Sequence, residues 1–529
     1  MKIEVTISPS KRNIQLQKSH GVSLTTWSNC NIMIEVSKMD NSMQEVSSVA
    51  QLYDGRSVFI TGASGFIGRV LLEKLLRCYT GIKRIYILMR TKKGEAPQER
   101  LHKRVLNVPL FDTIRDMESR DNIKLLDKIV VVPGDIGEPN LGISEQDMQT
   151  MLADETLSIV YHSAATIRFD EPLKVSVNLN LVATRKIIEF SRKLKNLISL
   201  CHVSTAYANS HLPEEMHIEE KIYPINKTPE QLITLVQHVD DATLQFLKPK
   251  LVAGRPNTYT YTKAMAEHLI ATEAADLPVA IVRPSIVVGA WKDPLPGWID
   301  NINGPTGLLL AISKGLLRTM HVIHKCKAEI IPVDVVVNTM IAATYYSAKQ
   351  NNQERITTNN SKHESATAGE EKKFIKTNEG YLPEKEPPIF HINSGDLNPI
   401  RWVEMEESVF PIVRSYPSVE TFRYPFGSFK NNYYHDLFLR LFVHFLPALI
   451  IDGICGIMGK KRRMMWIYGK IHAAIGALTH FVTHDYKFKT RNIQSLQNML
   501  NKSDQEQLFM DIERLNWPNF WNNFILGSR

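Results

Sequence analysis

The stretch SVFITGASGFIGRVLLEKLL, residues 57–76, decides the fold. It begins with a short apolar run that shows no polar alternation, which predicts a strand buried on both faces of a parallel sheet. Gly62, Gly65 and Gly68 follow at G-x-x-G-x-x-G spacing, and apolar side chains then recur at helical spacing on one face. A strand, a glycine-rich turn and a helix in this order are typical of the first unit of an α/β sheet.

The same alternation continues for some 230 residues. Five further apolar runs are interleaved with helical stretches such as 68–79 and 182–194, and they are RIYILM (84–89), KIVVVPGD (128–135), LSIVYHSA (157–164), LISLCHVS (197–204) and VAIVRPSIVVG (279–289). We therefore predict a doubly wound parallel sheet of the Rossmann type, with a smaller, mostly helical domain at the C-terminal end.

Composition shifts suggest how the chain is organised. We predict a polar N-terminal extension over 1–50, the sheet domain over 51–349 and a polar linker or loop over 350–388, which is almost free of aliphatic residues. Residues 389–423 begin with IFHINSG, expected as one more strand leading into the next region. Residues 424–529 are rich in aromatic and apolar residues and are expected to be helical.

Composition also bounds the function. With 43% hydrophobic and 22% charged residues, the chain of 529 residues is expected to be globular, and its net charge of +8 is too mild to indicate nucleic acid. The five cysteines are far apart in sequence, so we predict neither a metal site nor a disulfide framework. The N-terminus lacks the apolar core of a secretory signal.

The glycine-rich turn is a candidate phosphate-binding site. Glycines allow a tight turn and let backbone N–H groups approach a pyrophosphate at the helix N-terminus, although a turn without a ligand has the same pattern. After the second strand, Arg90 stands where NAD-binding chains usually carry an acidic residue, and Lys92 and Lys93 follow. Cations there favour the 2′-phosphate of NADPH, and the alternative is a solvated basic turn.

Tyr259 and Lys263, in PNTYTYTKAMAE, are the candidate acid–base pair. Four residues apart on a helix, they lie on one face, and a neighbouring ammonium is expected to lower the pKa of the phenol. A carbonyl reductase needs such a group to donate a proton as hydride arrives. Tyr261, two residues from the lysine, points elsewhere on a helix. The Y-x-x-x-K pattern alone is common by chance, so the catalytic interpretation depends on its position some 200 residues after the glycine turn.

The strand run LISLCHVSTAY delivers Ser204 and Thr205 at its carboxyl end, where parallel sheets meet their ligands. A hydroxyl there can hydrogen-bond a substrate oxygen. Cys201, in the same strand, could form an acyl-enzyme, but a buried structural thiol is the better interpretation. Asn178 and Asn180 are both candidates for an asparagine that orders the active-site lysine, or for ordinary helix amides.

Several motifs together resemble the eukaryotic fatty acyl-CoA reductases, which belong to the extended short-chain dehydrogenases. The resemblance is dense from about Tyr53 to Asn338, and its most specific element is WKDPLPGWIDN, which generic short-chain dehydrogenases lack. It is also carried by VFITGASGFIG, YHSAATIRFDEPL, HVSTAYAN, PNTYTYTKAMAE and IIPVDVVVN. The resemblance implies reduction of long-chain acyl-CoA to a primary alcohol with two NADPH, through a bound aldehyde.

The resemblance also implies roles for individual residues. Tyr259 and Lys263 would be the catalytic pair, and Thr205 rather than Ser204 would bind the substrate oxygen. Ala183 departs from the glycine that many relatives of the wider class have after the helix asparagine. The implied cofactor contacts are Thr61, Gly62, Gly65, Phe66, Ile67, Gly68, Arg90, Asp135 and Ile136, with Asp135 at the adenine unless it merely caps a turn.

The segment LFVHFLPALIIDGICGIMG, residues 441–459, is long enough to span a bilayer. Asp452 interrupts it, and a carboxylate at membrane depth is costly. The basic run Lys460–Arg463 follows directly and suits an anionic membrane surface. We expect membrane association rather than spanning, the alternative being a buried helix with a charged end. The expected location is the cytosolic face, of the endoplasmic reticulum rather than the peroxisome, since ILGSR is not an S-K-L signal.

Two other functions compete with acyl-CoA reduction. One is a single-hydride reductase or dehydrogenase acting on a sterol, another lipid carbonyl or a sugar nucleotide, although sugar-nucleotide chemistry would not need an apolar C-terminal domain. The other is a non-catalytic lipid- or nucleotide-binding protein, against which the intact Tyr259–Lys263 pair argues, since a pure binder has no need of both.

Overall fold

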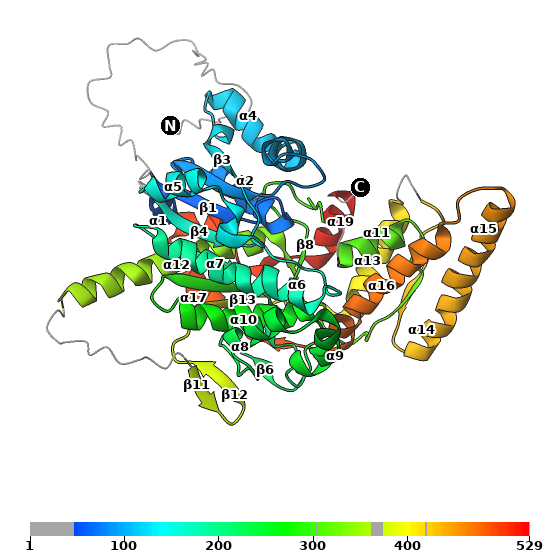
Figure 1. Cartoon of the computed structure of the whole chain (residues 1–529). Helices are drawn as coiled ribbons and strands as arrows, with labels where there is room; N and C mark the ends of the chain where they lie inside the picture. Colours follow the sequence, from blue (N-terminus) through cyan, green and yellow to red (C-terminus); the bar gives the residue numbers. More distant parts are fainter. Residues whose placement is uncertain (1–46, 302–303, 361–373, 418–420, 528–529) are drawn as a thin grey trace, which may run out of the picture. The chain divides into compact units, whose positions relative to one another are not determined.

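The computed structural model describes residues 47–301, 304–360, 374–417 and 421–527. Among these, seven strands form one parallel sheet in the order β13-β7-β5-β4-β1-β2-β3 (Figure 1). The chain runs from β1 out to β3 and then returns to place β4 on the other side of β1, which confirms the predicted doubly wound fold. The strands are β1 (Ser57–Thr61), β2 (Arg84–Met89), β3 (Ile129–Pro133), β4 (Leu157–His162), β5 (Ser199–Val203), β7 (Val279–Pro284) and β13 (Ile389–Ile392).

Both faces of the sheet are buried, as the apolar runs predicted. Along β1, Val58 and Ile60 belong to one hydrophobic cluster, while Phe59 between them belongs to a second one. Helices α2 (Phe66–Cys78) and α12 (Val333–Asn360) contribute to the first cluster, and α7 (Ala183–Lys193) and α10 (Thr258–Glu273) contribute to the second. The helices therefore form a layer on each face of the sheet.

One predicted strand divides into two. The run 279–289 forms β7 in the main sheet and then β8 (Ile286–Val288), which pairs with β10 (Ile330–Pro332) in a separate two-stranded sheet. Pro284 stands at the break, and because proline has no backbone N–H to donate, the ladder of the main sheet cannot continue evenly through it. Periodicity alone does not reveal such a change of sheet.

Two predicted boundaries differ from the structure. Residues 350–388, expected as a linker or loop, contain the last turns of α12 and the antiparallel hairpin of β11 (Phe374–Thr377) and β12 (Gly380–Pro383), on either side of 361–373, which lie outside the described residues. The extension predicted over 1–50 lies outside the described residues as far as 46, and α1 (Ser48–Tyr53) begins inside the predicted range.

The C-terminal region is helical, as expected, but it shares a core with the sheet. Ile475, Phe481 and Trp521 belong to the same hydrophobic cluster as Val58 of β1. Two short parallel ladders also join the regions: β14 (Ser428–Lys430) pairs with β9 (Thr319–His321), and β15 (Lys487–Phe488) pairs with β6 (His217–Ile218). The predicted separate domain is thus packed onto the first one over a continuous core.

The helices of the C-terminal region include an outlying helical segment, Tyr433–Ile457. They are α13 (Trp402–Ser415), α14 (Tyr433–Arg440), the π-helical turn η7 (Leu441–Phe445), α15 (Leu446–Ile457), α16 (Met464–Thr483), α17 (Arg491–Met499), α18 (Lys502–Gln507) and α19 (Trp517–Gly527). Elsewhere the chain forms α3 (Pro97–Arg100), α4 (Asp112–Asp121), α5 (Glu145–Ala153), α6 (Leu173–Val177), α8 (Pro229–His238), α9 (Asp241–Leu251) and α11 (Pro305–Ser313).

Candidate active site

The glycine turn lies at the carboxyl end of β1, beside the point where the strand order reverses. Gly62 has φ +81°, and a Cβ on it would lie 2.7 Å from the backbone nitrogen of Ala164. A Cβ on Gly68 would lie 2.2 Å from the carbonyl oxygen of Gly62, so α2 packs directly on the turn. Both positions therefore require glycine, for the turn and for close packing.

This turn fits a dinucleotide phosphate. Helix α2 begins after Gly65 with no side chain capping its N-terminus, which leaves backbone N–H groups free to meet an anion. Of the other predicted contacts, Phe66 and Ile67 are half-buried in the first turn of α2, with the Phe66 ring against Trp298. Thr61 is buried, and its hydroxyl bonds His162 Nδ1 at 2.8 Å, so it holds the end of β1 in place.

Arg90 and Asp135 lie together at the carboxyl ends of β2 and β3. The Arg90 guanidinium donates to the Asp135 carboxylate at 3.1 Å, and the arginine side chain is 54% exposed. Asp135 also accepts from the backbone N–H of Gly137 at 3.0 Å, so it does cap a turn, and the neighbouring Ile136 is half-buried. These groups stand on the side of the turn where the adenosine half of a dinucleotide would lie.

Tyr259 and Lys263 lie on one face of α10, as their spacing predicted. A side-chain hydrogen bond joins Tyr259 to Thr205, at the carboxyl end of β5. Burial nevertheless raises the pKa of Tyr259 to about 12, against the lowering expected from the lysine. Loss of water around the phenol dominates this pKa, and Lys263 Nζ donates instead to the backbone oxygen of Val203, at 2.7 Å. At neutral pH Tyr259 is therefore a protonated donor.

The pKa of Lys263 also differs from its usual value. Burial lowers the pKa of its ammonium to about 8, and the nearby Glu267 carboxylate acts in the opposite direction. Two imidazoles lie close to the ammonium: burial and the lysine's charge lower the pKa of His162 to about 3 and that of His202 well below its usual value. These two imidazoles are therefore neutral at pH 7 and add no positive charge beside the ammonium.

Ser204 and Thr205 are neighbours in sequence but have different surroundings. The Ser204 hydroxyl donates to Glu267 at 2.5 Å, and Glu267 forms a two-pronged ion pair with the buried Arg283 at 2.7 and 2.8 Å. Ser204 is thereby bound into a buried network, whereas the Thr205 side chain meets Tyr259. The structure brings Thr205, rather than Ser204, to the tyrosine.

The two candidate asparagines also separate. Asn180 is buried in a π-helical turn before α7, where it accepts from Thr166 N at 2.9 Å and donates to the Thr262 hydroxyl at 3.0 Å. Through Thr262 it is fixed to α10, the helix that carries Tyr259 and Lys263. Asn178 is exposed, and its amide reaches only the carbonyl of Gly137, at 3.4 Å.

Two further residues lie where the sequence interpretation placed them. Cys201 is fully buried in β5, and burial raises the pKa of its thiol to about 12, so it is not a thiolate at neutral pH. Tyr261 is also fully buried, on the far side of α10 from Tyr259, with the Arg255 guanidinium over its ring. Neither has the surroundings of a nucleophile or proton donor.

The sequence interpretation missed an aromatic wall beside the tyrosine. The ring of Phe169 lies 5.8 Å from that of Tyr259, and Phe481 of α16 lies 5.5 Å from Phe169. Tyr207, just after Thr205, packs edge-on against Phe481 at 4.7 Å. No spacing rule connects residues 169, 207 and 481, so only the fold could reveal that the C-terminal region forms one side of this site.

Solved structures of similar fold are distant in sequence. The reductase domain of a non-ribosomal peptide synthetase from Mycobacterium tuberculosis aligns with a TM-score of 0.52 and 16% identity, covering 89% of this chain and 91% of that one. The terminal R domain from the myxalamid biosynthetic pathway aligns at 0.51 and 18%, covering 89% and 90%. At these identities the likeness shows the fold alone.

Closer relatives cover nearly the whole chain. A family model described as "Male sterility protein" matches residues 60–340, and a second model with that description matches 443–529. "Fatty acyl-CoA reductase 1" of Rattus norvegicus is 36% identical over 482 residues, 91% of this chain and 85% of the relative. "Fatty acyl-CoA reductase 2" of Mus musculus is 35% identical over 484 residues, 92% and 86%. With its glycine turn and half-buried Tyr259 in the arrangement of a nicotinamide-dependent oxidoreductase, this chain belongs to the fatty acyl-CoA reductase family.

Proposed function

We propose that this enzyme reduces long-chain fatty acyl-CoA to the primary alcohol, using two NADPH and passing through a bound aldehyde. The observation that carries the proposal is the position of Tyr259. Its hydroxyl is joined to Thr205 at the carboxyl end of β5, near the glycine turn, and its ring borders the apolar wall begun by Phe169. A proton donor between a dinucleotide turn and an apolar wall suits a reducible group on a long alkyl chain.

Each of the two reductions adds one hydride and one proton to the substrate carbonyl. Bound NADPH supplies the hydride at the carbonyl carbon. Thr205 and Tyr259 hold the carbonyl oxygen, and Tyr259, protonated because burial raises its pKa, donates its proton as negative charge develops there. The resulting hemithioacetal breaks its C–S bond as its hydroxyl proton returns to the Tyr259 phenolate, releasing CoA thiolate and the aldehyde. The aldehyde accepts a second hydride and a second proton at the same place and leaves as the alcohol.

Lys263 serves the donor indirectly in this scheme. Its ammonium is held on the backbone oxygen of Val203, and the fixed amide of Asn180 supports the same helix face through Thr262. An ammonium in this buried setting stabilises the phenolate that is left when Tyr259 has donated its proton. The Cys201 thiol takes no part, because burial keeps it protonated.

The first experiment measures stoichiometry and product with the purified full chain. Palmitoyl-CoA and NADPH are expected to give hexadecanol by gas chromatography, with two NADPH oxidised per alcohol. Tyr259→Phe should lower turnover at least a hundredfold, since a positioned proton donor contributes about 10²–10⁴-fold. Tyr261→Phe is the matched control and should keep turnover, because its hydroxyl has no hydrogen-bond partner among the described residues.

Other outcomes would contradict the proposal in separable ways. Accumulation of hexadecanal with one NADPH consumed would show an aldehyde-forming enzyme. Turnover of a sterol ketone but not of palmitoyl-CoA would favour a single-hydride lipid reductase. Equal losses in Tyr259→Phe and Tyr261→Phe would show that the tyrosine has only a packing role.

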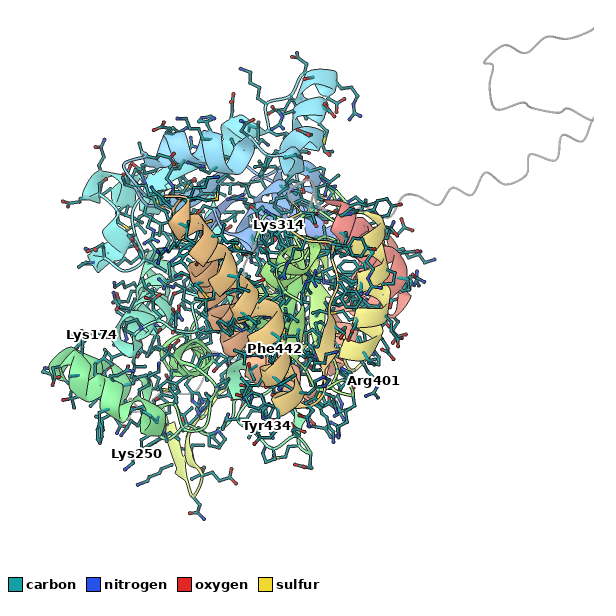
Figure 2. The ribbon with its side chains drawn as sticks, turned by 90° about the vertical axis from the view of Figure 1, so that its right-hand side faces the viewer. Lys174, Lys250, Lys314, Arg401, Tyr434 and Phe442 are labelled. Atoms are coloured by element: carbon teal, nitrogen blue, oxygen red, sulfur yellow. The ribbon has the colours of Figure 1, made fainter. Side chains whose placement is uncertain are left out.

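We also propose that the enzyme docks on the cytosolic face of a membrane through α14, η7 and α15. Among the described residues, Tyr433–Ile457 is the one helical stretch long and apolar enough to cross a membrane. Its outward face is formed by large apolar side chains that are 42–90% exposed. Figure 2 looks onto this face, with Tyr434 and Phe442 labelled on it. The exposed apolar side chains of this face are those of Tyr433, Tyr434, Leu437, Phe438, Leu441, Phe442, Leu446, Leu449, Ile450, Ile454 and Ile457.

Three polar residues of the same helices, Asp436, His444 and Asp452, are buried against the rest of the protein. Asp436 accepts from the Thr319 hydroxyl at 2.6 Å, and His444 Nε2 accepts from the backbone N–H of Arg318 at 2.9 Å. Asp452 accepts from the backbone N–H groups of Arg463, Met464 and Met465, each at 2.9 Å, which caps the start of α16. In the segment Tyr433–Ile457 these three polar groups are bound to the protein and the large apolar groups point outward. This arrangement suits docking on a bilayer rather than crossing it.

The exposed basic run Lys460–Arg463 lies at the end of the apolar face, where it can meet anionic lipid headgroups. Flotation with phosphatidylcholine vesicles, with and without phosphatidylserine, tests the proposal. Phe442→Asp with Ile450→Asp should abolish flotation, while Phe246→Asp, at an even more exposed apolar residue of α9, should not. Retention in the soluble fraction with both vesicle types would overturn the proposal, and release only by detergent after urea and high salt would indicate spanning.

A further inference from the structure

A narrow apolar cavity lies between the sheet domain and the C-terminal helices. Helices α11, α13 and α16 form its walls together with β8, β9 and β14, and no polar atom of the described residues contributes to its surface. Leu309 of α11, Met405 of α13 and Leu478 of α16 are among the lining residues, and all are buried. A cavity with such walls does not hold water, which needs several polar partners, but suits a hydrocarbon ligand.

The cavity ends one ring away from the active-site wall. Phe481, which lines the cavity, is the same ring that lies 5.5 Å from Phe169, and Phe169 lies 5.8 Å from Tyr259. Phe481 also packs against Tyr207, next to Thr205. A continuous series of apolar side-chain contacts therefore links Tyr259, through two phenylalanine rings, to the cavity.

We propose that this cavity binds the distal part of the substrate's alkyl chain. The assignment rests on the proposed function, because it takes the acyl carbonyl to lie at Tyr259 and Thr205. The chain then extends from the carbonyl along Phe169 and Phe481 and ends between α11, α13 and α16, while the CoA group stays outside the apolar walls. The C-terminal region would thus determine which acyl-chain lengths bind, while the sheet domain carries the groups that reduce the carbonyl.

The cavity has a volume of only about 20 Å³, so its walls must move apart to admit the end of an alkyl chain. Met320 of β9 and Met405 of α13 both line the cavity, and the flexible, unbranched methionine side chain adjusts its shape more readily than branched residues do. Every methylene moved from water into such a site improves binding about fourfold. Specificity for long chains then follows from the number of methylenes that reach past Phe481.

The first test blocks the cavity from α11. Leu309→Trp, at a lining position, should displace two or three methylenes and lower kcat/KM for palmitoyl-CoA about 15- to 60-fold, while hexanoyl-CoA, whose chain does not reach so far, should change less than twofold. Leu310→Trp, on the same helix but outside the lining, is the matched control and should leave both substrates unchanged. Equal effects of Leu309→Trp on both substrates, or no effect, would overturn the assignment.

The second test needs neither a variant nor turnover. Palmitoyl-CoA carrying a diazirine at the end of its alkyl chain is bound without NADPH and irradiated, and the labelled peptides are found by mass spectrometry. Label on α11, α13 or α16 inside the cavity is expected, and label confined to 433–457 or to parts of the sheet domain outside the cavity would overturn the assignment. If the cavity is labelled but no acyl-CoA is reduced, the proposed reaction fails while the binding site stands.

Discussion

Gly68→Ala tests whether the packing of α2 on the glycine turn shapes the dinucleotide site. The added Cβ would lie 2.2 Å from the backbone oxygen of Gly62 and 2.8 Å from the Cα of Ala63. Real Cβ atoms essentially never approach another atom below 3.0 Å, so helix and turn must move apart by roughly 1 Å. Both obstructing groups are backbone, so no side chain can swing aside to make room.

The magnitude follows from overpacking. Forcing one extra carbon into a well-packed place costs about 1–3 kcal/mol, which corresponds to about 5- to 150-fold in an equilibrium constant. If the turn keeps its shape, the loss appears in the free energy of unfolding. If the turn gives way, the protein remains stable and the loss appears in the Kd for the nicotinamide dinucleotide. The loss of unfolding free energy and the loss of binding free energy should add up to about 1–3 kcal/mol.

Gly476→Ala is the matched control, since both glycines lie inside helices. Gly476 is exposed on α16, and a Cβ added there would meet no neighbouring atom within 4 Å, so alanine should stabilise the fold by up to about 1 kcal/mol and leave cofactor binding unchanged. Urea unfolding and fluorescence titration with NADPH measure the two quantities. Unchanged stability together with unchanged affinity in Gly68→Ala would refute the reasoning.

Three further outcomes are expected. Arg90→Glu should raise the KM for NADPH about 10- to 100-fold and leave the KM for NADH unchanged. The control Lys83→Glu, just before the start of β2, should change neither KM. Equal effects of Arg90→Glu on both cofactors would refute a contact with the 2′-phosphate. Cys201→Ala should keep turnover within about twofold, and an acyl group trapped on Cys201 would contradict this. Burial lowers the pKa of Lys263 from 10.5 to about 8, so across that window the unfolded chain binds a proton that the folded protein has released. Relative to Lys263→Met, stability should therefore rise with pH there, by up to about 3 kcal/mol, and a pH-independent difference in urea unfolding would contradict it.

The sequence by itself determined the sheet and much of the site. Continuous apolar runs predicted strands buried on both faces, because a parallel sheet covered by helices leaves no polar side. The glycine spacing located the turn at Gly62 and Gly68, where backbone comes too close for a Cβ. Helical periodicity placed Tyr259 and Lys263 on one face of α10, since residues four apart lie one turn apart. These are local rules, and they hold before any tertiary contact forms.

Tertiary structure alone decided the rest. It directed Ser204 to the buried Glu267 and Thr205 to Tyr259, although the two hydroxyls are adjacent in sequence. It reversed the expected sign of the tyrosine's pKa shift, because burial outweighs a lysine that is bound to a backbone carbonyl.

It also brought Phe481, more than two hundred residues downstream, to within two aromatic contacts of Tyr259, and joined the C-terminal helices to the core of the sheet domain. Such contacts depend on how distant elements pack against each other, and helix and strand periodicity carry information only about which face of each element is apolar.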